Sequence, residues 1–233
     1  MIKLEHTEVF GWNAAIRGMR NPKNSWDKSD SYWTYIENPE TLNTVPFQFF
    51  LGDADKQLMQ SLSKGGNDHG KFLRMINVSL DITAPLYWWK EFDTYKVGTV
   101  ANSCSTMHKI HAKEFELGDF SHEHLTKGAI TDVLEPIVSV LNNAREAFVN
   151  YDKFNEQDPE GWEEGITGKK DLWWQLIQLL PSSYNQKRTI QLNYQVLKSM
   201  YFARKNHKLD EWHDFCAWCE SLPYFKEICL DVA

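Results

Sequence analysis

The sequence lacks the features that mark secreted proteins, membrane proteins and strings of domains. Its 233 residues include only four cysteines, whose spacing does not resemble a secreted disulfide framework, so we expect reduced thiols. No apolar run has the length of a signal-peptide core or of a membrane span. No linker rich in Pro, Gly or Ser divides the chain, and no internal repeat is visible. These absences predict a cytoplasmic protein, not attached to a membrane, with one domain over residues 1–233.

Cationic charge is scarce as well. The chain carries 25 Lys and Arg against 32 Asp and Glu, which gives a formal net charge of −7 and an isoelectric point near 5.6. Because a polymer of phosphates is repelled by such a balance, a long nucleic acid is not the expected partner. Aromatic residues, by contrast, are abundant, since they make up 14% of the chain and include ten Trp.

Motifs of several enzyme classes are missing too. Paired carboxylates, a glycine loop that cradles phosphates and a Ser/His/Asp arrangement are all absent, so hydrolase and kinase functions have no local support. His213, Cys216 and Cys219 occur as HxxCxxC with Cys229 further on, a donor set that is chemically adequate for zinc. Within one helix, however, each three-residue step rotates by about 300°, so these ligands would spread around the axis. We therefore predict a buried aromatic helix here and no metal site.

Hydrophobic periodicity predicts several helices. Apolar residues occur at helical spacing from Phe10 to Met19, and the stretch from Leu134 to Phe148 keeps one apolar face, with Pro136 in a first turn where proline is tolerated. The same kind of spacing predicts further helices over residues 53–63, 172–180, 191–204 and 209–220.

Fewer segments have the pattern of strands. Apolar and β-branched residues from Phe72 to Ile82 predict a strand that Pro85 ends. Residues 21–43 are expected to be mostly loop, and the acidic, glycine-bearing residues 151–170 to be an exposed insertion. Many helices around a small number of strands indicate the α+β class.

The most distinctive segment is a polar loop in the middle of the chain. It follows an aromatic helix and crowds hydroxyls, an amide and a thiol together, in Thr99, Asn102, Ser103, Cys104, Ser105 and Thr106. Because long apolar runs flank it, a rigid scaffold should present this loop, and loops held in that way commonly bind ligands. The alternative is a solvated connection that uses Ser, Thr and Asn only as turn formers.

Two further sets of side chains could react or bind a ligand. Cys104 has Lys96 and His108 nearby in sequence, and a neighbouring cation lowers a thiol pKa, so this cysteine is a candidate nucleophile. Asn193 and Arg204 are eleven residues apart, close to three helical turns, and would project from one face toward a planar ligand or a phosphate oxygen. The alternative for this pair is a solvated face with an intrahelical cap.

Several of these segments, in this order, resemble the flavin-dependent thymidylate synthases over most of the chain. Residues 15–20 (AIRGMR) are similar to the family's early A-V-R-A-A-R helix. Residues 58–75 resemble its next helix and the two histidines after it, with His69 at the first of them. Residues 83–85 (TAP) match the turn before the family's signature helix, and the spacing from Asn193 to Arg204 matches its last helix.

The family signature RHRxxSxNExSxRY is only partly present. After one extra residue, Asn102 and Ser105 match its Asn and its second Ser, while Thr99 replaces its first Ser. The other signature positions have lost the family's residues, with Thr94, Tyr95 and Lys96 at Arg-His-Arg, Ser103 at Glu, Met107 at Arg and His108 at Tyr. Each charge-assisted hydrogen bond lost in this way is worth about 1.5–3 kcal/mol. We therefore expect weak flavin binding.

The resemblance implies an α+β fold with a small sheet packed with several helices, assembled as a homotetramer because that family builds its sites between subunits. It implies a methyltransferase of pyrimidine nucleotide metabolism that reductively methylates dUMP or a related nucleotide. FAD would be the cofactor, with NADPH and methylenetetrahydrofolate as co-substrates. Ser105 would face the pyrimidine as the catalytic residue. The other implied site residues are Arg17, Arg20, Asn193 and Arg204 at the substrate and His69, Lys96, Thr99 and Asn102 at the cofactor.

A hypothesis from a different class competes with the enzyme. The chain would be a non-catalytic protein that kept the fold and a pocket for a nucleotide or another small molecule but lost flavin chemistry. The absence of the signature arginines and histidine favours this alternative, because most of the fixed positive charge that a flavin diphosphate requires is then missing.

Overall fold

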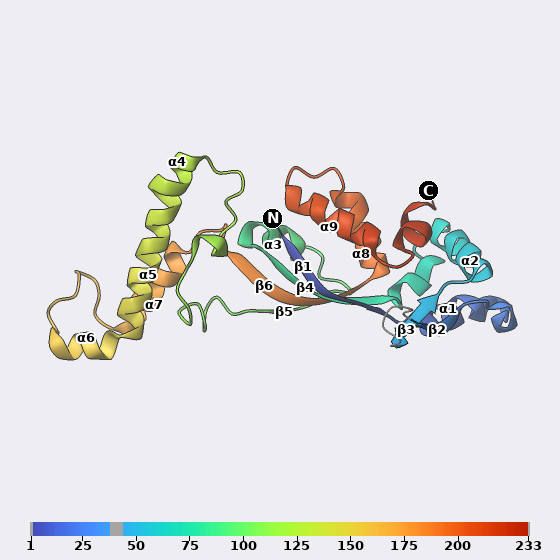
Figure 1. The fold of residues 1–233 in the computed structure, drawn as a ribbon, viewed down its shortest axis with the longest axis horizontal. Coiled ribbons are helices and arrows are strands. Elements are labelled where there is room, and N and C mark those ends of the chain that lie inside the picture. Colours follow the sequence, from blue (N-terminus) through green and yellow to red (C-terminus); the bar gives the residue numbers. More distant parts are fainter. Residues whose placement is uncertain (1, 38–43, 233) are drawn as a thin grey trace. The chain divides into compact units, whose positions relative to one another are not determined.

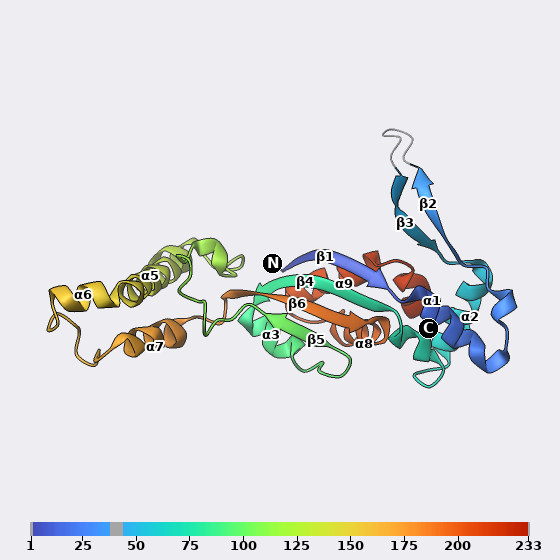
Figure 2. The same ribbon diagram turned by 90° about the horizontal axis from the view of Figure 1, so that it is seen from below.

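Two sheets and a set of helices make up the computed structural model, which describes residues 2–37 and 44–232. One sheet has four strands in the order β1-β4-β6-β5, and the other pairs β2 with β3 in antiparallel fashion (Figures 1 and 2). The strands are β1 (Lys3–Phe10), β2 (Tyr32–Glu37), β3 (Thr44–Phe50), β4 (Asn77–Pro85), β5 (Val100–Ser103) and β6 (Asn185–Asn193). The α-helices are α1 (Trp12–Arg20), α2 (Asp53–Lys64), α3 (Leu86–Phe92), α4 (Lys127–Ala129), α5 (Glu135–Val149), α6 (Tyr151–Gln157), α7 (Lys169–Leu179), α8 (Tyr194–Arg204) and α9 (Asp210–Ser221). The predicted α+β class is confirmed.

The chain forms two compact units. Unit 1 comprises residues 1–3, 82–94 and 102–188, and unit 2 comprises residues 4–81, 95–101 and 189–233. The polar loop therefore contributes residues to both units.

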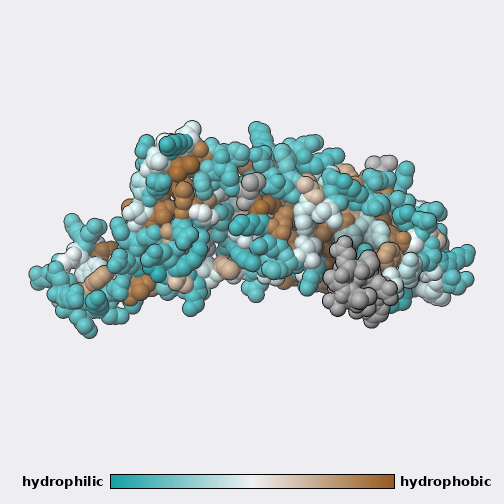
Figure 3. Space-filling view, viewed as in Figure 1, coloured by the Kyte–Doolittle hydropathy of each residue, from teal (hydrophilic) through white to brown (hydrophobic). Residues whose placement is uncertain are grey.

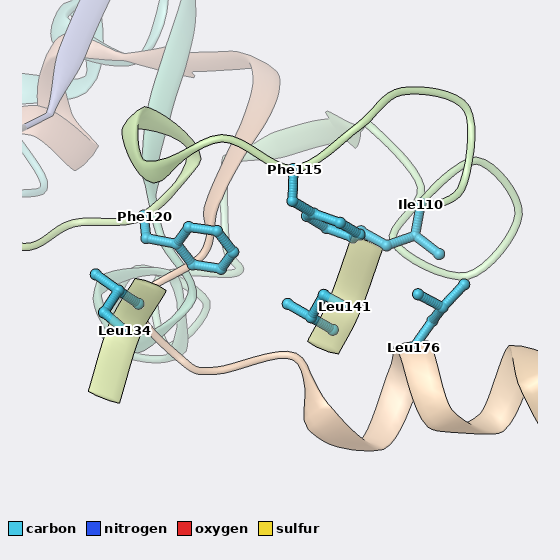
Figure 4. Packing of buried hydrophobic residues seen from close by; sticks show 6 residues of the cluster. All are labelled: Ile110, Phe115, Phe120, Leu134, Leu141 and Leu176. Carbon is cyan, nitrogen blue, oxygen red and sulfur yellow. The ribbon is translucent and has the colours of Figure 1, made fainter. Parts of the chain in front are cut away.

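Unit 1 has its own hydrophobic core. Ile110 and Phe115 from the loop segment pack with Phe120 and with residues of the helical pair α5 and α7, in the cluster Ile110, Phe115, Phe120, Leu134, Leu141 and Leu176 (Figure 4). Asn142 of α5 fixes the same segment, because its side chain accepts a hydrogen bond from the Phe115 N–H at 2.8 Å and donates one to the Phe115 carbonyl at 2.9 Å. The segment that follows Ser105 is thus anchored on a helical scaffold.

The helical pair also keeps apolar side chains at the surface. Val133, just before α5, and Val140 within it are 56% and 49% exposed, and hydrophobic residues gather at the surface over α5 (Figure 3). The predicted position of Pro136 in the first turn of α5 is confirmed.

Unit 2 is built around aromatic side chains. Trp12 of α1 stacks on Phe49 with a centroid distance of 4.8 Å and meets Tyr194 of α8 edge-on at 5.7 Å. Tyr194 also packs edge-on against Phe225 at 5.2 Å. Aromatic pairs in these geometries add stabilisation beyond their buried area, so much of the aromatic surplus serves folding within this unit.

Several expected boundaries were wrong. The first helix does not include Phe10, because this residue ends β1 and α1 begins only after Gly11, where a side chain would clash with the Met75 carbonyl. The strand expected from Phe72 begins at Asn77, since residues 70–74 form a 3-10 turn, and it ends at Pro85 as predicted.

Of the strands that the structure describes, β4 was predicted, and β1, β2, β3, β5 and β6 were missed. Residues 32–37, expected to be loop, form β2, while residues 38–43 of that expected loop lie outside the described residues. The helix expected over 191–204 begins at Tyr194, because residues 185–193 form β6. The helices expected over 53–63, 172–180 and 209–220 are present with small shifts at their ends.

Candidate functional site

A cleft of about 460 Å³ lies within unit 1 beside the polar loop. We call it the loop cleft. It is lined by one residue of β4, by the loop and the segment after it, and by the start of β6, namely Thr83, Cys104, Ser105, Thr106, Lys109, Ile110, Lys113, Phe115, Asp119, Tyr184, Asn185, Gln186 and Lys187. Its volume lies in the range of small-molecule pockets.

The loop cleft is cationic in a chain that is acidic overall. Lys109, Lys113 and Lys187 line it against the single carboxylate of Asp119. Lys113 and Asp119 form an ion pair with an N–O distance of 2.6 Å, and Lys109 and Lys187 are the further lysines of the lining. With a net charge of −7 on the whole chain, this local excess points to an anionic ligand.

Hydrogen bonds fix the loop against β6. The Cys104 N–H donates to the Lys187 carbonyl at 2.9 Å, and the Gln186 side-chain amide donates to the Cys104 carbonyl at 2.7 Å. Further along, the Trp173 indole N–H donates to the Met107 carbonyl at 2.8 Å. Hydrogen bonds to neighbouring elements therefore fix the loop at Cys104 and Met107.

Ser105 has a half-buried hydroxyl in the loop cleft. Its Oγ accepts the backbone N–H groups of Met107 at 3.2 Å and His108 at 2.9 Å. Because a hydroxyl accepts through its lone pairs and keeps one proton, Ser105 still has a donor to offer a ligand. Cys104 lies beside it with an exposed side chain.

Aromatic rings also line the loop cleft. Phe115 and Tyr184 meet edge-on with centroids 6.3 Å apart. Burial raises the pKa of the Tyr184 phenol above its ordinary value of 10.0, and the charge of Asp119 adds to this rise. Tyr184 therefore stays neutral at physiological pH and presents an O–H donor next to an apolar surface.

A second group of candidate residues lies in unit 2, along α8. The Arg204 Nε–H donates to the Tyr95 hydroxyl at 2.9 Å, and the guanidinium lies 4.8 Å from the centroid of the Trp212 ring. Gly98 approaches Asn193 so closely that an added side-chain carbon would lie 3.3 Å from Asn193 Nδ2, and its φ of +77° favours glycine. The segment 95–101 thus packs on α8, and we call Tyr95, Thr99, Asn193 and Arg204 the α8 face.

Asn193 does not project from the helix as predicted. Its backbone is extended, it ends β6, and its side chain accepts the Val196 N–H at 3.1 Å as the N-cap of α8. The prediction that Asn193 and Arg204 share one helical face is therefore wrong, since a cap residue precedes the helix. The alternative interpretation, an intrahelical cap, agrees with the hydrogen bond that Asn193 accepts from the Val196 N–H.

Arg20 is engaged inside unit 2. Its side chain is 4% exposed and pairs at 2.6 Å with Asp55, which is fully buried. Its other guanidinium nitrogens donate to the carbonyls of Ser25 and Lys28. Burial alone would raise the pKa of Asp55, but hydrogen bonds from Ser29, from Ser31 and from Arg20 outweigh it and lower that pKa. Arg20 thus holds a buried carboxylate in the fold.

Of the remaining predicted site residues, all but Thr99 are exposed. Arg17 is exposed on α1, His69 is exposed in the turn before residues 70–74, and Lys96 is exposed in segment 95–101. Thr99 has a buried hydroxyl oxygen that finds no hydrogen-bond partner within residues 2–37 and 44–232. Asn102 is exposed in β5 and, like Ser105, belongs to unit 1, whereas the other predicted site residues belong to unit 2.

The residues that align with the start of the family signature do not fit a flavin diphosphate. Thr94 Oγ1 donates to the Glu91 carbonyl at 2.7 Å and so closes the end of α3. In unit 2 the Tyr95 hydroxyl accepts a hydrogen bond from Arg204. At the three positions that align with Arg-His-Arg of the signature, this chain has one cation, Lys96. A single lysine lacks the bidentate geometry with which arginines hold phosphates.

The cysteines other than Cys104 are buried. Burial raises the pKa of Cys216 to about 11 and that of Cys229 to about 12, so both thiols are protonated at neutral pH.

In the part of the chain that the structure describes, no three His, Cys, Asp or Glu side chains are grouped to hold a metal ion. Nor does any described helix have the length and apolar character needed to cross a membrane.

Comparison with known proteins identifies the fold. No family model and no curated protein matches the chain. Two solved structures of flavin-dependent thymidylate synthase from Helicobacter pylori, each with FAD and dUMP, are similar to it in fold. One has a TM-score of 0.62 and 17% identity over 99% of both chains. The other has a TM-score of 0.62 and 16% identity over 100% of this chain and 99% of that one. The chain therefore has the flavin-dependent thymidylate synthase fold.

Sequence reasoning located the loop but missed most of the cleft. Lys109, Lys113, Asn185 and Lys187 all line it, and none was predicted. For Asn185 and Lys187 a signal was present, because residues 189–193 (TIQLN) alternate between polar and apolar as a strand does, and the polar residues 185–188 directly precede them.

Proposed function

We propose that the protein binds a pyrimidine deoxynucleotide, with the loop cleft as its binding site. The main support is that lysines outnumber carboxylates in a pocket of nucleotide size, beside a hydroxyl and aromatic rings. The fold supports the choice of ligand, because the similar solved structures hold dUMP. A pyrimidine nucleotide combines an anionic phosphate with a flat, partly apolar base, and the cleft offers partners for both.

Each group has a role in this proposal. Lys109 and Lys187 attract the phosphate, while Lys113 is largely neutralised by Asp119. Ser105 and Tyr184 donate hydrogen bonds, and Phe115 supplies apolar contact. A hydrogen bond to a charged group contributes about 1.5–3 kcal/mol, so two lysine contacts suffice for measurable binding.

A second candidate is the full reaction, reductive methylation of dUMP or a related nucleotide by a divergent flavin-dependent thymidylate synthase. The full-length likeness to enzymes crystallised with FAD and dUMP favours it. Here Arg17, Arg20, Asn193 and Arg204 would serve the substrate, and His69, Lys96, Thr99 and Asn102 would serve FAD. FAD would supply hydride transfer, with NADPH and methylenetetrahydrofolate as co-substrates. The poor fit to a diphosphate of the residues that align with the start of the family signature places this candidate second.

Calorimetric titration of the purified protein with dUMP tests the first proposal. We expect saturable binding that weakens with rising ionic strength, because lysines provide the attraction. Absence of binding at low salt would remove the proposal. The visible absorption spectrum after addition of FAD and desalting tests the second candidate, since one bound flavin per chain would restore it to first place. A protein that stays colourless would leave nucleotide binding alone.

A further inference from the structure

A chain of polar contacts leads from α3 to the loop through Gln186 and Arg188 of β6. Gln186 is 7% exposed, its Nε2 donates to the Cys104 carbonyl at 2.7 Å, and its Oε1 accepts the Arg188 Nε–H at 3.0 Å. These residues all belong to unit 1. The buried amide of Gln186 thus joins the Arg188 guanidinium to the backbone of the loop.

Arg188 is itself held by α3 and the residue that ends it. Its Nη1 donates to Asp93 Oδ1 at 2.7 Å, and its guanidinium carbon lies 4.1 Å from the centroid of the Trp89 ring. The side chain is only 13% exposed. The Trp89 indole N–H also donates to the Gln186 backbone carbonyl at 2.9 Å. An ion pair and a cation–π contact therefore fix the guanidinium beside Gln186.

The chemistry of arginine decides which way the Gln186 amide points. A side-chain amide can turn end for end and exchange its oxygen with its NH₂ group, but an arginine N–H only donates and a backbone carbonyl only accepts. The amide oxygen therefore lies toward Arg188, and the NH₂ group lies toward Cys104. The reverse orientation would set donor against donor and acceptor against acceptor around a buried side chain, which is unfavourable.

From this chain of contacts we infer that Arg188 is a positioning residue of the loop cleft. Successive side chains of a strand leave opposite faces, so Arg188 leaves β6 on the face opposite to Lys187, which lines the cleft. Arg188 acts through Gln186, which holds the Cys104 carbonyl and so keeps the next residue, Ser105, in place at the ligand. This inference rests on the proposed nucleotide function. Loss of the guanidinium then lowers dUMP affinity from outside the cleft.

Titration of Arg188→Met and Lys153→Met with dUMP tests the inference. Both variants lose one positive charge, and Lys153 is the matched control because it is exposed on α6. We expect Arg188→Met to weaken dUMP binding by roughly 3- to 10-fold, the effect of one lost hydrogen bond, and Lys153→Met to stay within about twofold. Equal affinities for Arg188→Met and the unmodified protein would overturn the inference and leave the proposed function intact.

The same change in a Ser105→Ala background separates positioning from a merely structural role. Arg188→Met should then weaken dUMP binding by less than about twofold, because the group that it positions is already gone. An equal loss in both backgrounds would overturn the inference. Gln186→Met interrupts the chain of contacts at its centre and decides the matter if Arg188→Met does not fold. Its effect should equal that of Arg188→Met, and losses that add in the double variant would contradict the inference.

Hydrogen–deuterium exchange of the free protein gives a readout that needs no ligand. The backbone amides of Met107 and His108 donate to Ser105 Oγ, so they report on the place of this hydroxyl. They should exchange faster in Arg188→Met and in Gln186→Met than in the unmodified protein, and unchanged exchange would overturn the inference. An unmodified protein that does not bind dUMP would refute the proposed function, and the inference with it, whatever the exchange shows.

Discussion

The loop cleft of unit 1 and the α8 face of unit 2 both carry polar groups that could bind a nucleotide, but they differ in how those groups are used. On the α8 face, Asn193 caps a helix and Arg204 bonds Tyr95 and stacks on Trp212. In the loop cleft, the lysines outnumber the carboxylate. The amide and guanidinium of the α8 face thus hold the fold, although the buried Thr99 hydroxyl there finds no partner in the described residues, whereas the loop cleft gathers lysines around a cavity.

The largest expected effect comes from breaking the internal network of unit 2. Asp55→Ala leaves the Arg20 guanidinium buried without its counter-ion, and such a loss costs about 3–5 kcal/mol of unfolding free energy. Urea unfolding measures it, with the exposed Arg17→Ala as control, for which a change within about 0.5 kcal/mol is expected. A small loss for Asp55→Ala would contradict the structural role of Arg20.

The same pair predicts a dependence of stability on pH. The folded pKa of Asp55 is lowered, so its contribution is present above the ordinary value of 3.8 and is lost as the pH falls from there through the folded pKa. Urea unfolding of the unmodified protein and of Asp55→Asn between pH 6 and pH 2 checks this. The difference in stability between the two proteins should shrink toward the acid end, and a constant difference would show that the carboxylate charge is not responsible.

The next effect tests the cleft itself. Lys109→Ala and Lys187→Ala should each weaken dUMP binding by about 1.5–3 kcal/mol, because each removes a charge-assisted contact to the phosphate. The exposed Lys153→Ala in the same unit is the control and should leave the affinity nearly unchanged. Equal losses for all three variants would indicate that only net charge matters and that the cleft has no particular role.

Arg204→Ala sharpens the comparison from the other side. The contact of its guanidinium with Trp212 predicts a loss of about 0.5–2 kcal/mol in stability, with dUMP affinity unchanged. Thermal unfolding and titration of the same sample separate the two quantities. A loss of affinity without a loss of stability would instead support the substrate-binding role that the family resemblance implies.

The smallest effect distinguishes the two neighbours in the loop. Ser105→Ala should weaken dUMP binding by about 0.5–1.5 kcal/mol, the worth of one neutral hydrogen bond, and Cys104→Ala should not weaken it. Function lost only with Cys104→Ala, together with rapid alkylation of this thiol by iodoacetamide at low pH, would favour the nucleophile hypothesis.

Periodicity was a good guide to the helices and a poor one to the edges of the sheet. The apolar spacing of Leu134 to Phe148 predicted α5 because one face of that helix is buried in a core. β1 gave no such signal, since it is a sheet edge and most of its residues are exposed. The alternation in β6 was mistaken for the start of α8, because the strand leads directly into the helix at Asn193.

The site was only half predictable for a related reason. The hydroxyls and thiol of the loop are neighbours in sequence, so composition alone drew attention to them. Asn185 and Lys187 reach the same cleft from about eighty residues further along the chain, through the pairing of the loop with β6. Nothing local marks two residues of a strand as part of a cleft, because that depends on what surrounds them after folding.

Hydrogen–deuterium exchange with and without dUMP tests the central claim most directly, because it observes both regions in one experiment. If the loop cleft binds the nucleotide, the backbone amides of residues 104–116 and 184–188 should exchange more slowly in its presence, and those of α8 should not change. Protection confined to residues 193–204, with none around the loop cleft, would contradict the account.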